Sequence, residues 1–122
     1  MKFDHAILLA SDLAASLPWY DAVLPAIGFG KSRDHVWVNA EGQALELRQA
    51  GEPGHGYRRH GPGLNHIAFV APSLAAIEAV AAKVRDAGFE VADIQSFDSD
   101  RALFLKDPDG MRIELTAYDA AG

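Results

Sequence analysis

Apolar and polar positions along this chain follow the same order twice. In the first half, residues 3–10 are mostly apolar and form a run of the length expected for a buried β-strand. A helix is expected next with Ser16 as its N-cap, because proline is tolerated in the first helical turn and Pro18 would then lie there. Gly28 is expected to end this helix. Three further short strands, separated by turn-forming residues, are predicted at residues 29–31, 35–39 and 44–49.

The second half predicts the same elements in the same order. Residues 64–71 form an apolar run typical of a strand, and Ser73 can cap a helix that continues to about Ala87. The apolar positions of this helix recur at helical spacing. The segment from Asp107 to Gly110 is a strong turn signal. Three strands are predicted after the helix, at residues 89–94, 102–106 and 111–116.

Individual residues repeat together with the pattern. Each half begins with a histidine, at His5 and His66, and closes on a glutamate between two apolar residues, at Glu46 and Glu114. Self-similarity on this scale indicates one supersecondary unit that is used twice. We therefore predict an α+β fold of two tandem βαβββ modules within a single domain. The predicted boundaries are 1–122 for the domain, 1–50 for module one, 51–63 for a glycine-rich linker and 64–117 for module two.

Composition narrows the classes of protein to which the chain can belong. At 122 residues, with 49% apolar and 23% charged residues, it is typical of one globular domain. We expect no membrane span, since no apolar run reaches roughly 18 residues. We also expect no signal peptide, since Asp4 lies among the first residues and no small-residue cleavage site precedes the first predicted strand. The chain has no cysteine, which excludes disulfides and thiolate metal sites and favours a cytoplasmic location. A net charge of -6 disfavours binding to nucleic acid.

The four repeated polar residues are the strongest functional signal. Taken one at a time, each histidine is an ordinary core or edge residue, and each glutamate is an ordinary residue on a solvated strand face. A carboxylate between apolar neighbours in a buried strand is costly, however, unless a cation lies beside it. The recurrence of one histidine and one glutamate at equivalent places favours a shared metal ion over four unrelated occurrences. The predicted ligands are His5, Glu46, His66 and Glu114.

This set of ligands limits the choice of metal. Two imidazoles and two carboxylates without sulfur suit a borderline divalent ion such as Zn, Ni, Co, Mn or Fe. The ligand types alone do not choose among these metals. Four protein ligands leave one or two positions of an octahedral ion open to water or substrate, as catalysis requires.

The chain resembles the vicinal oxygen chelate superfamily, on motifs that lie in both halves. These motifs are Asp4-His5, Ser11-Asp12-Leu13, Leu45-Glu46-Leu47, residues 63–69 (GLNHIAF) and residues 107–115 (DPDGMRIEL). The superfamily includes glyoxalase I, fosfomycin-resistance enzymes, methylmalonyl-CoA epimerase, extradiol dioxygenases and bleomycin-binding proteins. The resemblance covers essentially the whole chain, and its last two motifs are specific.

The resemblance implies a fold and an activity. In this family each module forms a mixed sheet that curls around a metal cup, and the four ligands above match the family's motifs. The implied function is a metal-dependent, glyoxalase-like lyase or isomerase for a small oxygenated substrate, with Glu46 or Glu114 moving the substrate proton. The alternative is a small-molecule binding or antibiotic-resistance protein without catalysis. Short members of the family commonly dimerise, so we expect a homodimer.

Glutathione is not expected as a co-substrate. Glutathione-dependent members carry an arginine four residues after the first histidine and an asparagine four residues after the first glutamate. This chain has Leu9 and Ala50 at those positions. An apolar leucine cannot pair with the carboxylates of the tripeptide.

Three further residues are candidates for contact with the substrate. Arg58 and Arg59 lie in the linker, where they would contact an anionic substrate at the mouth of the cup. A solvated polar loop is the more ordinary explanation of these two charges. Trp37 either lines the cup or packs beneath a helix, and the sequence does not choose between these two positions.

Overall fold

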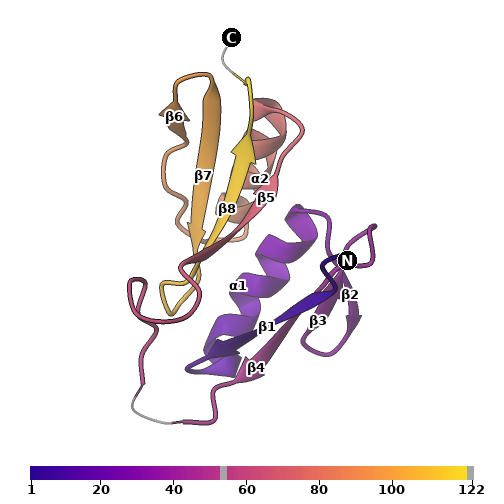
Figure 1. The fold of residues 1–122 in the computed structure, drawn as a ribbon, viewed down its shortest axis with the longest axis vertical. Helices are drawn as coiled ribbons and strands as arrows, with labels where there is room; N and C mark the ends of the chain where they lie inside the picture. Colours follow the sequence, from indigo (N-terminus) through magenta and orange to yellow (C-terminus); the bar gives the residue numbers. More distant parts are fainter. Residues whose placement is uncertain (53–54, 121–122) are drawn as a thin grey trace. The chain divides into compact units, whose positions relative to one another are not determined.

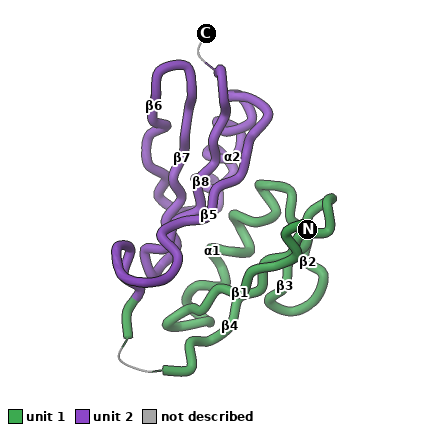
Figure 2. Tube along the Cα trace, in the orientation of Figure 1, with its two compact units in different colours: residues 1–56 green, residues 57–122 purple. Residues whose placement is uncertain are grey.

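The computed structural model describes residues 1–52 and 55–120, and the chain divides into two compact units, residues 1–56 and 57–122 (Figure 2). The boundary between the units falls within the predicted linker. Pro53 and Gly54, which belong to that linker, lie outside the described residues.

Among its described residues, each unit contains one helix and one four-stranded sheet (Figure 1). The elements of unit 1 are β1 (His5–Ala10), α1 (Leu13–Ala26), β2 (Gly30–Arg33), β3 (Val36–Val38) and β4 (Ala44–Gln49). The elements of unit 2 are β5 (His66–Val70), α2 (Leu74–Asp86), β6 (Gln95–Phe97), β7 (Asp100–Lys106) and β8 (Arg112–Ala117). Neither helix is long and apolar enough to cross a bilayer, in the part of the chain that the structure describes.

The two sheets have the same topology. Their strand orders are β1-β4-β3-β2 and β5-β8-β7-β6, with the first pair of each order parallel and the other pairs antiparallel. This equivalence confirms the prediction of two βαβββ modules in an α+β fold. Each module is a four-stranded mixed sheet, and the predicted curl around a metal cup is not seen in the described residues.

Each sheet buries one face under its own helix. In unit 1 the buried side chains Leu8, Leu45, Leu47 and Trp37 share this face by strand register. In unit 2 the equivalent positions of β7 and β8 are Leu103, Leu105, Ile113 and Leu115, which are all buried. We call the opposite side of each sheet its open face. Exposed apolar side chains lie on it, including Ile7 and Leu9 of β1 and Val70 of β5.

The strand predicted at residues 3–10 is therefore buried on one side only. It begins at His5, and the exposure of its residues alternates along the strand, with Ile7 and Leu9 exposed and Leu8 and Ala10 buried. The apolar run predicted a buried strand. The helix covers one face, and in unit 1 the second face carries apolar side chains that remain exposed.

The predicted start of α1 at Ser16 was wrong. The N-cap is Asp12, whose carboxylate accepts a 3.2 Å hydrogen bond from the backbone of Ala15. Pro18 lies inside the helix, where it gives up one main-chain hydrogen bond. An aspartate cap and the buried helix face offset this loss, and that face consists of Ser16, Trp19, Tyr20, Val23 and Leu24.

The strand predicted at residues 89–94 was also wrong. The backbone N–H of Phe89 donates to the carbonyl of Val84, so Phe89 belongs to the C-terminal cap of α2. Sheet pairing begins only at Gln95, opposite Ala102. The same cap ends α1, where the N–H of Phe29 donates to the carbonyl of Leu24.

Both caps depend on a glycine in the left-handed region. Gly28 and Gly88 each have a φ of 95°, a conformation that residues with a Cβ rarely adopt. The Gly-Phe pair repeated in the sequence is thus the end of a helix in both modules. It sets the point at which each chain segment turns back into its sheet.

Candidate functional site

The two histidine–glutamate pairs occupy equivalent places in their sheets. In unit 1, Glu46 lies opposite Ile7 of the parallel neighbour β1, two residues after His5. In unit 2, Glu114 lies opposite Ala68 of β5, two residues after His66. Because side chains alternate along a strand, both members of each pair project from the open face of their sheet.

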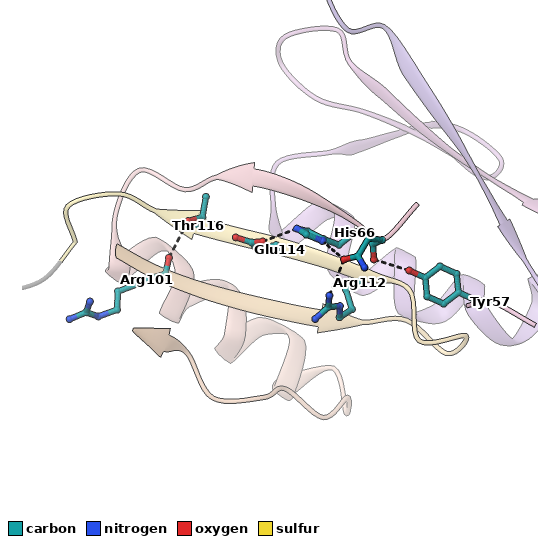
Figure 3. A network of polar contacts seen from close by, with 7 residues as sticks. Tyr57, His66, Arg101, Arg112, Glu114 and Thr116 are labelled. Carbon is teal, nitrogen blue, oxygen red and sulfur yellow. Dashed lines mark hydrogen bonds and ion pairs between the residues drawn. The ribbon is translucent and has the colours of Figure 1, made fainter. Parts of the chain in front are cut away.

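In unit 2 the two side chains are in contact. His66 Nε2 lies 3.0 Å from Glu114 Oε1, and the Glu114 side chain is 17% exposed (Figure 3). A carboxylate removed from water to this extent is favoured by a positive charge beside it. A proton on the imidazole supplies such a charge, and so does a metal ion held by both groups.

The other ring nitrogen of His66 is engaged as well. His66 Nδ1 lies 2.7 Å from Asn65 Oδ1, which also accepts a 3.2 Å hydrogen bond from Arg112 Nη2. Arg112 is buried, and its guanidinium carbon lies 4.8 Å from the centre of the Phe104 ring. Asn65 and Arg112 were not among the predicted site residues. The available signal for Asn65 was its place directly before His66, as Asp4 stands directly before His5.

In unit 1 the two members have separate partners. His5 Nδ1 lies 2.6 Å from Asp4 Oδ2. Arg48 binds Glu46 through two 3.0 Å hydrogen bonds, from Nε to Oε1 and from Nη2 to Oε2. These bonds lower the pKa of Glu46; desolvation opposes them, and the charges of Arg48, Arg33 and His5 act with them. Glu46 therefore remains a carboxylate to lower pH and is a weaker proton acceptor than an unpaired glutamate.

The donors of unit 2 fit a divalent ion. An imidazole nitrogen and a carboxylate oxygen are both donors that a borderline divalent ion accepts. In unit 2, His66 Nε2 and Glu114 Oε1 supply one of each and lie 3.0 Å apart. No group of three or more metal-binding side chains is found among residues 1–52 and 55–120. The four-ligand site therefore remains a prediction.

Of the three residues predicted to contact the substrate, Trp37 is buried and Arg58 and Arg59 are exposed. Trp37 lies on the helix-facing side of unit 1, fully buried, with its ring 6.3 Å from that of Tyr20 in α1. This side chain supports the core of unit 1, so we leave it out of the proposed site. Arg58 and Arg59 are exposed in the loop before β5, and the carbonyl of Arg59 accepts a 2.8 Å hydrogen bond from Asn65 Nδ2.

Two curated proteins match most of this chain. The chain is 28% identical over 117 residues to biphenyl-2,3-diol 1,2-dioxygenase 3 of Rhodococcus globerulus, a match that covers 93% of this chain and 62% of the dioxygenase. The chain thus spans less than two thirds of that protein's length. It is 32% identical over 123 residues to the uncharacterized protein YqjT of Bacillus subtilis (strain 168), covering 93% of this chain and 96% of YqjT.

Solved structures and a family model agree with these matches. A glyoxylase/bleomycin resistance protein/dioxygenase domain from Frankia sp. EAN1pec has a TM-score of 0.77 at 21% identity, covering 97% of this chain and 92% of that one. A lactoylglutathione lyase from Agrobacterium tumefaciens has a TM-score of 0.65 at 18% identity, covering 95% and 92%. These two likenesses show the fold. The family model matches residues 2–115, and the chain therefore belongs to the Glyoxalase/Bleomycin resistance protein/Dioxygenase superfamily.

Proposed function

We propose that this protein is a metal-dependent, glyoxalase-like lyase or isomerase that acts on a small oxygenated substrate without glutathione. The observation that carries the proposal is the histidine–glutamate pair, which recurs in the same sheet register in both modules. We propose that His5, Glu46, His66 and Glu114 together hold one divalent ion, which can be Zn, Ni, Co, Mn or Fe. In each unit the histidine and the glutamate project from the open face of the sheet, where a substrate could reach a bound ion.

The two glutamates have different surroundings, which favours different roles. A divalent ion in this site would polarise the substrate oxygens and make the adjacent carbon more acidic. Glu114 then serves as the proton acceptor, because its contact is an imidazole rather than a guanidinium. Glu46 remains the charged partner of Arg48 and contributes charge to the site, since the bidentate contact lowers its pKa.

Two residues near His5 and Glu46 in unit 1 disfavour glutathione as a co-substrate. Leu9 projects from the same face as His5 and is 64% exposed, so an apolar side chain stands where a charged one would meet the tripeptide. Ala50 follows β4 and offers no side-chain hydrogen bond. We propose Arg58 and Arg59 as the groups that contact an anionic part of the substrate instead.

Two other functions have specific support. A ring-cleaving dioxygenase is favoured by the match to biphenyl-2,3-diol 1,2-dioxygenase 3, and two histidines with one carboxylate are the ligands of non-haem Fe(II) oxygenases. A small-molecule binding or antibiotic-resistance protein without catalysis is favoured by the Arg48–Glu46 contact, which occupies both oxygens of one predicted ligand.

Metal titration and three assays separate these functions. Metal-free protein is expected to bind one divalent ion per chain when each of the five metals is titrated by calorimetry. The loaded protein is then assayed with methylglyoxal, with methylglyoxal plus glutathione, and with 2,3-dihydroxybiphenyl in air. Lactoylglutathione formation with kcat/KM above about 10² M⁻¹s⁻¹, a hundredfold below the ordinary range, would contradict independence from glutathione. Ring cleavage with Fe(II) would favour the dioxygenase, and a protein that binds none of the metals would favour the binding protein.

We also propose that the protein is a homodimer. The open face of unit 1 carries Ile7 and Leu9, and that of unit 2 carries Val70 and Phe97, all of which are exposed within one chain. Covering such apolar surface is a common reason for association. Sedimentation equilibrium at micromolar concentration is expected to give twice the chain mass. A mass of 13.1 kDa, that of a single chain, would contradict the dimer.

A further inference from the structure

We infer that Asn65 and Asp4 are positioning residues that direct the Nε2 atoms of His66 and His5 toward the metal by accepting a hydrogen bond from Nδ1. This inference rests on the proposed metal site. In each unit the residue directly before the histidine supplies a side-chain oxygen to Nδ1, at 2.7 Å from Asn65 and at 2.6 Å from Asp4. Outer partners of this kind fix the orientation and protonation of metal-binding histidines.

The hydrogen bonds around Asn65 determine which way its amide group faces. Asn65 Nδ2 lies 2.8 Å from the carbonyl oxygen of Arg59, which can only accept a hydrogen bond. Asn65 Oδ1 lies 3.2 Å from Arg112 Nη2, which can only donate one. Reversing the amide would break both contacts. The atom that faces His66 Nδ1 is therefore an oxygen.

The orientation of the amide in turn requires a proton on Nδ1 of His66. Oδ1 is an acceptor, so His66 Nδ1 must be the donor. Nε2 then faces the Glu114 carboxylate at 3.0 Å. A lone pair on Nε2 and a carboxylate oxygen repel each other unless a positive charge is shared between them. Asn65 thus prepares His66 and Glu114 to share a cation.

Asn65 is held in place although it is exposed to solvent. Its amide makes hydrogen bonds in two directions, to Arg59 and to Arg112. The hydroxyl of Tyr57 lies 2.7 Å from the carbonyl oxygens of both Leu64 and Asn65, and so connects the backbone here to the preceding loop. The buried Arg112 is itself stacked against Phe104. A side chain fixed on several sides can fix the ring that it contacts.

Unit 1 has the same contact to the histidine Nδ1, made by a different type of residue. Asp4 and Asn65 share one property at this position, an acceptor oxygen on a short side chain. The carboxylate of Asp4 makes a charge-assisted hydrogen bond, which is stronger than that of an amide. Asp4 is 87% exposed, so solvent competes for its contact with His5. We therefore expect the larger and more easily measured effect at Asn65.

The test uses Asn65→Leu, Asn65→Asp and a control. In metal-free wild-type protein, nitrogen-edited NMR is expected to show a hydrogen-bonded Nδ1–H proton on His66 that exchanges slowly with water. Asn65→Leu removes the acceptor and should abolish this signal and weaken metal binding by about 10- to 100-fold. Asn65→Asp keeps an acceptor oxygen and should restore both the signal and most of the affinity.

The control is Asn39→Leu, which removes an equally bonded asparagine from another site. The amide of Asn39 accepts from the backbone of Glu41 and Gln43 and donates to the Gln43 side chain in the turn before β4. Its loss should lower thermal stability and leave the His66 signal and the metal affinity unchanged. Persistence of the protected Nδ1–H in Asn65→Leu, or its absence from the wild type, would overturn the inference. The signal is recorded without metal, so it tests the Nδ1–H hydrogen bond separately from metal binding. A wild type that shows the signal but binds no metal would overturn the proposed function, and with it the role of Asn65 toward the metal, while the hydrogen bond itself would stand.

Discussion

Replacing His66 with alanine is expected to weaken the binding of divalent metal by at least about a hundredfold. Loss of an outer partner of a metal ligand typically costs 10- to 100-fold, and loss of the ligand itself should cost no less. At a free metal concentration about a hundred times the wild-type Kd, binding stabilises the wild type by about 2.7 kcal/mol. With a hundredfold weaker Kd, the same concentration stabilises the variant by about 0.4 kcal/mol. Calorimetric titration gives the Kd, and thermal unfolding with and without metal gives the stabilisation.

The matched control for this experiment is His60→Ala. His60 is an exposed histidine in the loop before β5, and it is not among the proposed ligands. Its replacement should leave the Kd for metal and the metal-induced rise in Tm at their wild-type values. Equal Kd values for His66→Ala and the wild type would show that the pair in unit 2 does not bind the metal.

Replacing Glu114 with glutamine is expected to lower kcat by about 10²- to 10⁴-fold when metal is saturating. This range is the usual contribution of a positioned proton acceptor. Glutamine keeps a side-chain oxygen of similar reach but cannot take up a proton from the substrate. The measurement is kcat and KM for whichever substrate the assays identify, at metal concentrations raised to compensate for weaker binding. A fall in kcat with little change in KM indicates loss of the acceptor rather than loss of substrate binding.

The companion variant Glu46→Gln decides between the two glutamates. Glu46 is bound on both oxygens by Arg48, and its lowered pKa makes it the weaker acceptor, so this variant should lose less kcat than Glu114→Gln. A larger loss in Glu46→Gln would assign the proton transfer to Glu46. Equal and small losses in both variants would reject a glutamate as the acceptor.

The architecture of the modules could be predicted because the repeat constrains two halves at once. The spacing of His5 and Glu46 alone allows many arrangements, and the same two residues at equivalent places in the second half favour one supersecondary unit. The alternation of side chains then placed each histidine and glutamate on one face of a strand. The structure adds the parallel register that makes His66 and Glu114 neighbours.

The predictions of the start of α1 and of a strand at residues 89–94 failed because caps and tertiary contacts outweighed the local sequence pattern. Such interactions cannot be read from the order of apolar and polar residues alone. Pro18 suggested a late helix start, but the cap at Asp12 and the burial of Trp19 and Tyr20 outweigh one missing hydrogen bond. The apolar residues from 89 onward suggested a strand, but the helix cap takes the N–H of Phe89. Asn65 was missed because its role depends on Arg59 and Arg112, and Arg112 is distant in sequence.

The placement of one arginine in each module breaks the symmetry that duplication would produce. Arg48 lies two residues after Glu46 and donates two hydrogen bonds to that carboxylate. Arg112 lies two residues before Glu114 and donates a hydrogen bond to Asn65 instead. Two copies of one unit would otherwise carry two interchangeable carboxylates. Moving a single guanidinium to the other side of the glutamate leaves one carboxylate neutralised and the other joined to a histidine. The two modules are thereby chemically unequal, because the glutamate of one is paired with an arginine and the glutamate of the other with a histidine.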